Sequence, residues 1–521
     1  MRTFFEKFDS LAGIGRSGTF IKWSERAAFF FMLLMIAAAP HSIAATQTAW
    51  IIGTLIWFSR FLVKPRPQVK FTKLDAALWA FFGWSVLSSL TSYAPDISID
   101  KLRGVIVFLI LYFVLYNLRN LRAVYFAAFL LIISCLVNVV WTPIDRLIGR
   151  GVEVHGLAPD GPLAKALFKD GDTLLEADGK KIRTPEELLA AVASKETTAV
   201  KFYRPDYYWS YDVKRADLFN GSSALERLGA ASWQKSSNWR SQGFYNHYTT
   251  YAEVLQLILS LIFGLLVASL RKKDIGDAAS APFHRLAKMP LLLVCTFLFG
   301  LALLLTVTRA SQLSFMISAA LIILLGAGRK WIWRAALIGI PVVAVGLIFV
   351  QQSRHVGFFD TKDDSIKWRE TVWREGVDLW TKNARNLVVG VGMDSKNRFE
   401  KEWHLFDDGR LNSGHFHSTP LQLVVERGFP ALLLWLLFLW FYGRGLLKAL
   451  GKAKLSGNDI DIGILLGCFG GMIGFFTSGL IHYNLGDTEV AMVFFILAGI
   501  GIRLSRNFNE NTVVSINSSE I

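Results

Sequence analysis

The stretch SGHFHSTPLQLVVERGFP, residues 413–430, leads into an apolar run that continues to residue 442. Ser418 is a suitable N-cap, and Gly428 can end a short helix that begins just after it. Pro430 then opens a longer helix whose composition suits a lipid bilayer. The stretch therefore predicts a polar loop, a short helix and a membrane helix, in that order.

Two histidines, His415 and His417, lie in the loop just before the short helix. Imidazole exchanges a proton near neutral pH, which few other side chains can do. One interpretation is a site of proton transfer where the loop meets the membrane. The other is a polar loop that only anchors a helix at the interface.

The composition indicates a membrane protein. Hydrophobic residues make up 53% of the 521 residues, more than soluble domains carry. We predict an all-α polytopic membrane protein with about twelve transmembrane helices, in contact with membrane lipids. The three cysteines, Cys135, Cys295 and Cys468, lie inside apolar runs, so their spacing indicates no metal site. No cofactor is expected.

The basic residues predict the topology. The formal net charge is +15, but Lys and Arg lie mainly between apolar runs on alternate sides, which argues against a nucleic-acid partner. Basic short loops stay cytoplasmic. Both termini are therefore expected inside and both large polar segments outside, which in a bacterial inner membrane is the periplasm. The spans are expected at roughly 27–44, 46–63, 74–91, 103–118, 124–141, 249–270, 290–307, 311–327, 335–351, 430–446, 461–481 and 488–503.

A small α/β insert is expected at residues 148–204. The segments GRGVEV, DTLLEADGK and TTAVKFY predict strands, and GPLAKAL predicts a short helix. Thr184 begins a capping box, TPEE, before the apolar face of LLAAV. This order, with the pattern LAPDGPLAKALFKDGDTLLEADGKKI, resembles a PDZ domain. The resemblance implies a peptide or protein partner that adds to a sheet edge; the alternative is a rigid spacer.

Two further outside segments are rich in aromatic residues. Residues 205–248 are expected to form a periplasmic linker whose aromatic side chains make an interfacial belt or a sugar-stacking surface. The segment IKWRETVWREGVDLW, residues 366–380, spaces its tryptophans as an amphipathic helix does. Such a helix lies on the membrane or caps a cavity.

Arg309 stands out because of its expected location. It lies in LTVTRASQ, a very short outside turn, where Lys and Arg are normally scarce. An anionic ligand would compensate its charge, because guanidinium groups bind phosphate through paired charge-assisted hydrogen bonds. The alternative is snorkelling or a structural ion pair. Arg240, in NWRSQGFYNHYTTYAEV, is expected on the same side, but in a long loop.

Four motifs, in this order, resemble the Wzy-C superfamily of bacterial O-antigen ligases, O-antigen polymerases and some protein O-oligosaccharyltransferases. They are RSQGFYNHYTTYAEVLQL, LTVTRASQLSFMISAALIILL, WRETVWREGVDLW with NLVVGVG, and HFHSTPLQLVVERGFPALLLW. The resemblance implies an inverting, metal-independent glycosyltransferase of the multispanning type. Its donor would be a glycan on undecaprenyl diphosphate, and its acceptor a hydroxyl of lipid A-core.

The resemblance also implies roles for individual residues. The two family arginines correspond to Arg240 and Arg309, which would bind the donor diphosphate, and the family histidine corresponds to His417. Ser418 replaces the common Asn, and His415 is a second catalytic candidate. Two arginines suit a departing diphosphate, and a histidine can take or orient the proton of a sugar hydroxyl.

Other functions stay open from the sequence. Within the superfamily the acceptor could be a growing polysaccharide or a protein instead. Outside it, a lipid-linked glycan transporter is the alternative, although the apolar runs are nearly free of charge apart from Glu253 near a helix end. A membrane anchor for the PDZ-like insert would need far fewer spans.

These predictions combine into one domain order. It is 1–147 for helices one to five, 148–204 for the PDZ-like domain, 205–248 for the aromatic linker, 249–351 for helices six to nine, 352–429 for a periplasmic catalytic loop, 430–505 for helices ten to twelve, and 506–521 for a cytoplasmic tail.

Overall fold

A computed structural model describes most of the chain and divides it into two compact units. The described residues are 2–15, 18–204, 207–236, 239–271, 283, 285–328, 330, 337, 348, 364–411, 414–456 and 458–517. One unit comprises Met1–Val139 and Phe244–Ile521, and the other Val140–Gly243.

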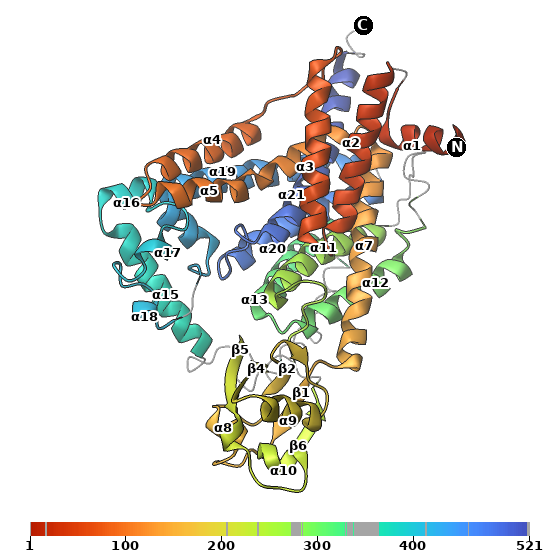
Figure 1. Ribbon diagram of the computed structural model, residues 1–521. Helices are drawn as coiled ribbons and strands as arrows, with labels where there is room; N and C mark the ends of the chain where they lie inside the picture. Colours follow the sequence, from red (N-terminus) through yellow and green to blue (C-terminus); the bar gives the residue numbers. More distant parts are fainter. Residues whose placement is uncertain are drawn as a thin grey trace. The chain divides into compact units, whose positions relative to one another are not determined.

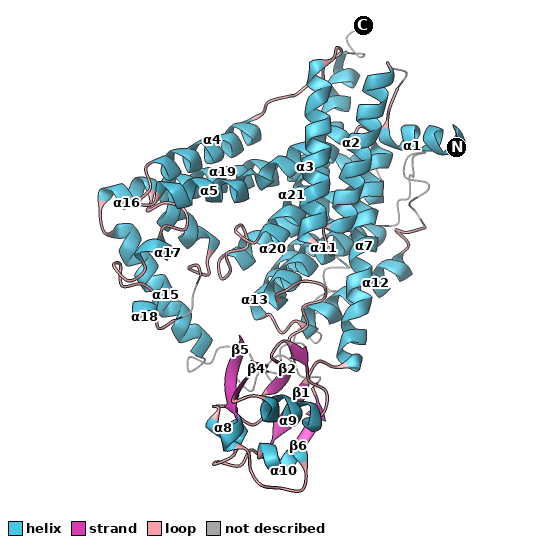
Figure 2. Ribbon diagram, in the orientation of Figure 1, coloured by secondary structure: helices cyan, strands magenta, loops and turns pink. Residues whose placement is uncertain are grey.

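Helices build the first unit (Figures 1 and 2). They are α1 (Arg2–Ala12), α2 (Thr19–Ala38), α3 (Ile43–Ser59), α4 (Lys73–Leu90), α5 (Pro95–Val105), α6 (Leu109–Asn117), α7 (Leu121–Ile148), α11 (Tyr248–Ser269), α12 (Met289–Leu305), α13 (Arg309–Gly326), α15 (Asp364–Thr381), α16 (Ala384–Val389), α17 (Lys396–Phe399), α18 (Phe406–Gly409), α19 (Thr419–Ser456), α20 (Asp459–Gly479) and α21 (Thr488–Asn517).

Six of the described helices are long and apolar enough to cross a membrane, namely α7, α11, α13, α19, α20 and α21. The chain is therefore a multi-pass membrane protein. α12 is apolar but shorter. The expected fourth span, near 103–118, is not one helix, because a 3₁₀ turn, Ile106–Phe108, separates α5 from α6. The expected ninth span, near 335–351, falls mainly outside the described residues.

The centre of this unit is the contact between α11 and α20. A Cβ placed on Gly264 of α11 would lie 2.4 Å from the backbone nitrogen of Gly467 and 2.5 Å from the carbonyl oxygen of Gly463, both in α20. Small residues let helix backbones approach this closely, which is how membrane helices gain packing energy without a hydrophobic drive between them. α11 is consequently buried along almost its whole length.

α19 is interrupted where the sequence predicts the end of a short helix. Gly428 has φ 74°, and a Cβ there would lie 2.0 Å from the carbonyl oxygen of Val388. The backbone N–H of Leu421 donates to Ser418 Oγ at 3.4 Å, so Ser418 caps the first segment as predicted. A short helix and a long apolar helix therefore follow each other inside α19.

The second unit is an α/β domain. Its sheet has the order β5-β4-β2-β1-β6, with β3 paired to β2, and every pair is antiparallel. The elements are β1 (Val152–His155), α8 (Pro162–Lys165), β2 (Thr173–Ala177), β3 (Lys180–Lys181), α9 (Pro185–Ser194), β4 (Thr197–Arg204), β5 (Tyr207–Lys214), α10 (Ala224–Leu228) and β6 (Ser232–Lys235).

The elements predicted between 148 and 204 all form. Glu187 N–H donates to Thr184 Oγ1 at 3.3 Å at the start of α9, and β2 turns into β3 at Asp178 and Gly179. The expected boundary at residue 204, however, falls between two paired strands. Segments of the expected linker, 205–248, supply β5 and β6. Aromatic residues pair across β4 and β5, as Phe202 does with Trp209, and β6 pairs with β1.

We expect Gly264→Ala to lower stability by about 1–3 kcal/mol, because its methyl group would meet the backbone of α20. Thermal unfolding of the purified protein in detergent measures this. Gly300→Ala is the matched control, since a Cβ at Gly300 of α12 has no neighbour within 4 Å. Equal melting temperatures for the two variants would contradict the close approach of α11 and α20.

Candidate active site

The loop before α19 holds His415 and His417 in contact with each other. The backbone N–H of His417 donates to His415 Nδ1 at 3.1 Å, and the two ring centroids are 3.9 Å apart. A neutral imidazole has one N–H, so the acceptor role of Nδ1 assigns the proton of His415 to Nε2. His415 can thus donate a hydrogen bond through Nε2, while its other nitrogen is already used.

His417 has an uncommon backbone conformation. Its φ is 47°, in the left-handed region that residues other than glycine seldom adopt. Such a conformation costs on the order of 1–3 kcal/mol and persists where the surroundings impose it. Its ring makes no hydrogen bond to another of the described residues. The imidazole of His417 is therefore held in place through its backbone and through ring packing.

α15 supplies the packing for that ring. Trp368 lies against His417 edge-on, with ring centroids 4.5 Å apart. The amphipathic helix expected over 366–380 thus lies beside the histidine loop, and Trp368, Val372 and Gly376 lie on the face that packs against it. The sequence indicated the helix, but nothing in it indicated which residue the helix would cover.

The start of α19 is also tied to the connection between α20 and α21. Thr419 donates its backbone N–H to the carbonyl of His482 at 3.1 Å, and its hydroxyl to Asn484 Oδ1 at 2.9 Å. Asn484 Nδ2 in turn donates to the carbonyl of Phe475 at 2.7 Å, within α20. The histidine loop is therefore anchored to the end of α20.

Both imidazoles are neutral at pH 7. Burial, and then the positive charge of Lys396, lowers the pKa of His415 to about 4. Burial, and then the neighbouring His415, lowers the pKa of His417 further. A neutral imidazole is the form that can accept a proton. The loop thus presents the basic form of histidine over the whole neutral range.

Arg309 is the first residue of α13. The turn from α12 spans only Thr306–Thr308, as predicted, and Val307 takes φ 51° within it. The side chain of Arg309 is partly buried.

Helix pairing brings Arg309 and the histidine loop to the same end of the bundle. Ser318 of α13 donates to the carbonyl of Gly470 at 2.8 Å, and Gly326 lies against Leu466, so α13 runs antiparallel to α20. The start of α13 is therefore level with the end of α20, where Thr419 is bonded.

Arg240 belongs to the other compact unit. Its side chain is buried, and its backbone N–H lies 3.4 Å from the hydroxyl of Tyr203. Its participation in a common site with Arg309 stays a prediction. Among the described residues, no group of three or more His, Cys, Asp or Glu is arranged to hold a metal ion.

Comparison with known proteins gives one family match and short matches to two individual proteins. Residues 294–436 match the model of a family described as O-antigen ligase (Wzy_C), and this range contains Arg309, His415 and His417. A segment of 78 residues is 36% identical to the magnetosome formation protease MamE of Paramagnetospirillum magneticum. A segment of 77 residues is 36% identical to the protein of the same name from Magnetospirillum gryphiswaldense. Each match covers 15% of this chain and only 10% of the relative.

The family match coincides with the helices that carry the histidine loop and Arg309. Each match to the two proteases, by contrast, spans only a tenth of the relative. Residues 294–436 of this multi-pass membrane protein therefore form a region that matches the O-antigen ligase (Wzy_C) family.

Proposed function

We propose that the protein transfers a glycan from undecaprenyl diphosphate to a hydroxyl of lipid A-core at the periplasmic face of the bacterial inner membrane. The observation that carries this proposal is the pair of neutral, packed histidines at the same end of the bundle as Arg309, all within the matched family range. A neutral base and a cationic group at one end of the bundle suit the attack of a sugar hydroxyl on a phosphate-linked sugar.

The proposed reaction is a single inverting displacement without a metal ion. The acceptor oxygen forms a bond to the anomeric carbon, and the bond from that carbon to the phosphate oxygen breaks. His417 takes the hydroxyl proton, because its ring nitrogens carry no hydrogen bond to another described residue. His415, whose Nδ1 accepts from His417 N–H, orients the acceptor through Nε2. Arg309 and Arg240 stabilise the departing diphosphate.

We also propose the full topology of about twelve spans with both termini inside. It supports the periplasmic location, because the histidine loop and Arg309 share the end of the bundle to which the charge bias assigns the outside. The opposite end agrees with this, since the basic side chain of Lys454, near the end of α19, donates to the carbonyl of Leu325 at 2.6 Å.

The second unit is proposed to be a PDZ-like domain that selects a partner. Its sheet ends in two edge strands, β5 and β6, which offer unpaired backbone groups to an added strand. The short resemblance to two proteins named as proteases supports a module shared between otherwise different proteins. The rigid-spacer interpretation remains the alternative.

Lipopolysaccharide from a deletion strain tests the choice of acceptor. Loss of a ligase leaves bare lipid A-core on a gel, whereas loss of a polymerase leaves cores that bear a single repeat. We expect bare core, restored to full-length lipopolysaccharide by the parent gene and not by Arg309→Lys, because a point charge cannot replace a planar fork. Single-repeat cores would favour the polymerase, and normal lipopolysaccharide would contradict both.

We expect His417→Ala to lower the transfer rate by about a hundredfold or more while donor binding is kept, because the proton acceptor is lost. Purified enzyme with undecaprenyl-diphosphate glycan and acceptor measures the rate. His404→Ala is the matched control, since the side chain of His404 is 80% exposed and pairs with Asp408 on the surface. A fully active His417→Ala would contradict the assignment, and a dead His415→Ala beside it would show that His415 is the proton acceptor instead.

The pH dependence should reveal the lowered pKa values. An ordinary histidine with a pKa of 6.5 would lose its basic form below pH 6.5, whereas we expect transfer to stay constant to about pH 5.5 and to fall only toward pH 4. Because the folded pKa of His415 is depressed, its neutral form contributes stability in full above pH 6.5, and this is lost as the pH falls toward 4. A midpoint near 6.5 in the rate profile would contradict this environment.

A further inference from the structure

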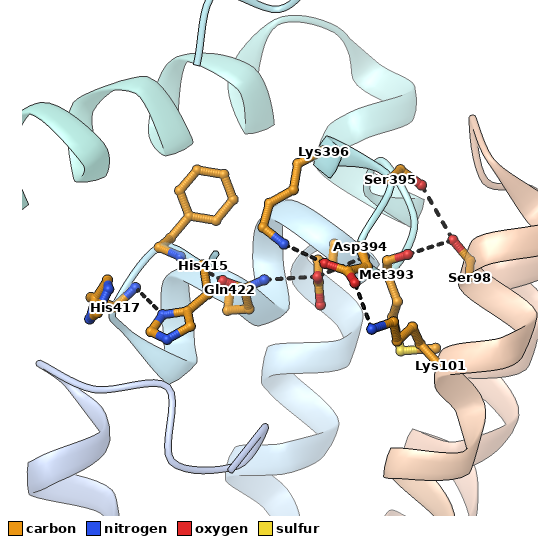
Figure 3. Close-up of polar contacts among 11 residues, drawn as sticks. Ser98, Lys101, Met393, Asp394, Ser395, Lys396, His415, His417 and Gln422 are labelled. Carbon is orange, nitrogen blue, oxygen red and sulfur yellow. Dashed lines mark hydrogen bonds and ion pairs between the residues drawn. The ribbon is translucent and has the colours of Figure 1, made fainter. Parts of the chain in front are cut away.

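Gln422 contacts the histidine loop at its centre. The backbone N–H of Phe416, the residue between the two histidines, donates to Gln422 Oε1 at 2.8 Å. Both residues are fully buried. This hydrogen bond satisfies a buried backbone donor that would otherwise be costly to leave unpaired. Gln422 thus fixes the backbone from which both imidazoles project (Figure 3).

Glu426 determines which way the amide of Gln422 points. Gln422 Nε2 donates to Glu426 Oε1 at 2.8 Å, one helical turn further along α19. An ionised carboxylate only accepts hydrogen bonds, so it selects the amide orientation that turns Nε2 toward Glu426 and Oε1 toward Phe416. Rotating the amide by half a turn would bring two acceptors together and leave the Phe416 N–H facing another N–H.

Glu426 is itself held by the loop that precedes α17. The backbone N–H of Asp394 donates to Glu426 Oε1 at 2.9 Å. The Asp394 carboxylate bridges two lysines, at 2.6 Å from Nζ of Lys396 and 2.7 Å from Nζ of Lys101 in α5 (Figure 3). Lys101 lies outside the matched range 294–436. The series of contacts therefore connects an N-terminal helix with the histidine loop.

We propose that Gln422 and Glu426 are positioning residues that hold the His415–His417 backbone in its reactive geometry, with Asp394 and Lys101 as their anchor. This inference rests on the proposed function, because it assigns a role in the transfer reaction. Neither side chain needs to touch donor or acceptor. Their contribution is the direction of one amide group and, through it, the left-handed backbone at His417.

Exchanging the two residues gives a sharp test. In Gln422→Glu the donor to Glu426 is lost, and the repulsion between two facing carboxylates displaces the side chain from its position beside Phe416 N–H. In the double variant Q422E/E426Q, the carboxylate introduced at position 422 accepts from Phe416 N–H. It also accepts from the N–H of the amide introduced at position 426. The oxygen of that amide accepts from Asp394 N–H. Net charge and every hydrogen bond of this series are kept. We expect about a hundredfold loss of kcat in Q422E, as for a misplaced catalytic group, with donor KM unchanged.

The double variant should recover to within about threefold of the parent, which a double-mutant cycle reports as strong coupling. Gln422→Met provides a second test if Q422E does not fold, because it removes both hydrogen bonds without adding a charge, and the same loss of kcat is expected. E426Q alone should be mild, since the amide oxygen can accept both bonds. The control is Gln234→Glu, in the edge strand β6 of the other unit.

The outcomes separate this inference from the proposed function. Loss in Q422E and Q422M, with recovery in the double variant, supports positioning. A fully active Q422M, or a folded double variant as impaired as Q422E, would overturn it even if His417→Ala is inactive. Normal lipopolysaccharide in the deletion strain would instead refute the proposed function, whereas a fully active His417→Ala would refute only the role assigned to His417.

Discussion

The close approach of α11 and α20 is the contact on which the first unit depends. With Gly264, Gly463 and Gly467 at the crossing, backbone meets backbone, and neither helix can shift without losing this contact. α13 packs on both helices, and the connection after α20 holds the beginning of α19 through Thr419. Packing in the apolar interior thus determines where the polar loops lie at the end of the bundle.

The candidate site combines a buried base with a constrained backbone. Desolvation keeps His415 and His417 neutral. Burial of these polar rings costs free energy, because they lose their contact with water. The surroundings offset the cost through specific contacts, which are the ring of Trp368 and the amide of Gln422. Exposed histidines, with a pKa near 6.5, would be largely protonated near pH 6 and less well oriented.

Local signals in the sequence predicted local structure well. Ser418 caps its helix, Gly428 interrupts α19, and the strands and the Thr184 N-cap of 148–204 form where the residues indicated them. The reciprocal bond of the expected capping box differs, because Glu187 Oε2 accepts from the N–H of Arg183. Interactions between distant residues could not be predicted this way. Nothing near residue 422 reveals that Asp394 will donate to Glu426, and an apolar run alone does not show the 3₁₀ turn that splits α5 from α6.

For the same reason the second unit extends past its expected end. Strand pairing is decided by partners, and the aromatic residues after position 204 find theirs across β4. The region that matches the family, by comparison, contains short motifs. Their order along the chain indicates the family even though it does not indicate which residues contact each other. Arg309 and His417 could therefore be singled out, whereas Trp368, Gln422 and Glu426 needed coordinates before their roles could be considered.

The glycine contact also has a consequence for biosynthesis. α11 ends at Ser269 and α20 begins at Asp459, so about 190 residues must be made before the partner surface exists. At the usual rates of translation this takes about 10–40 s. During that interval the surface of α11 around Gly264, and the buried carboxylate of Glu253 on the same helix, must be accommodated by lipid, by α12 and α13, or by the insertion machinery. The helices α11 and α20 can therefore pair only late in the synthesis of the chain.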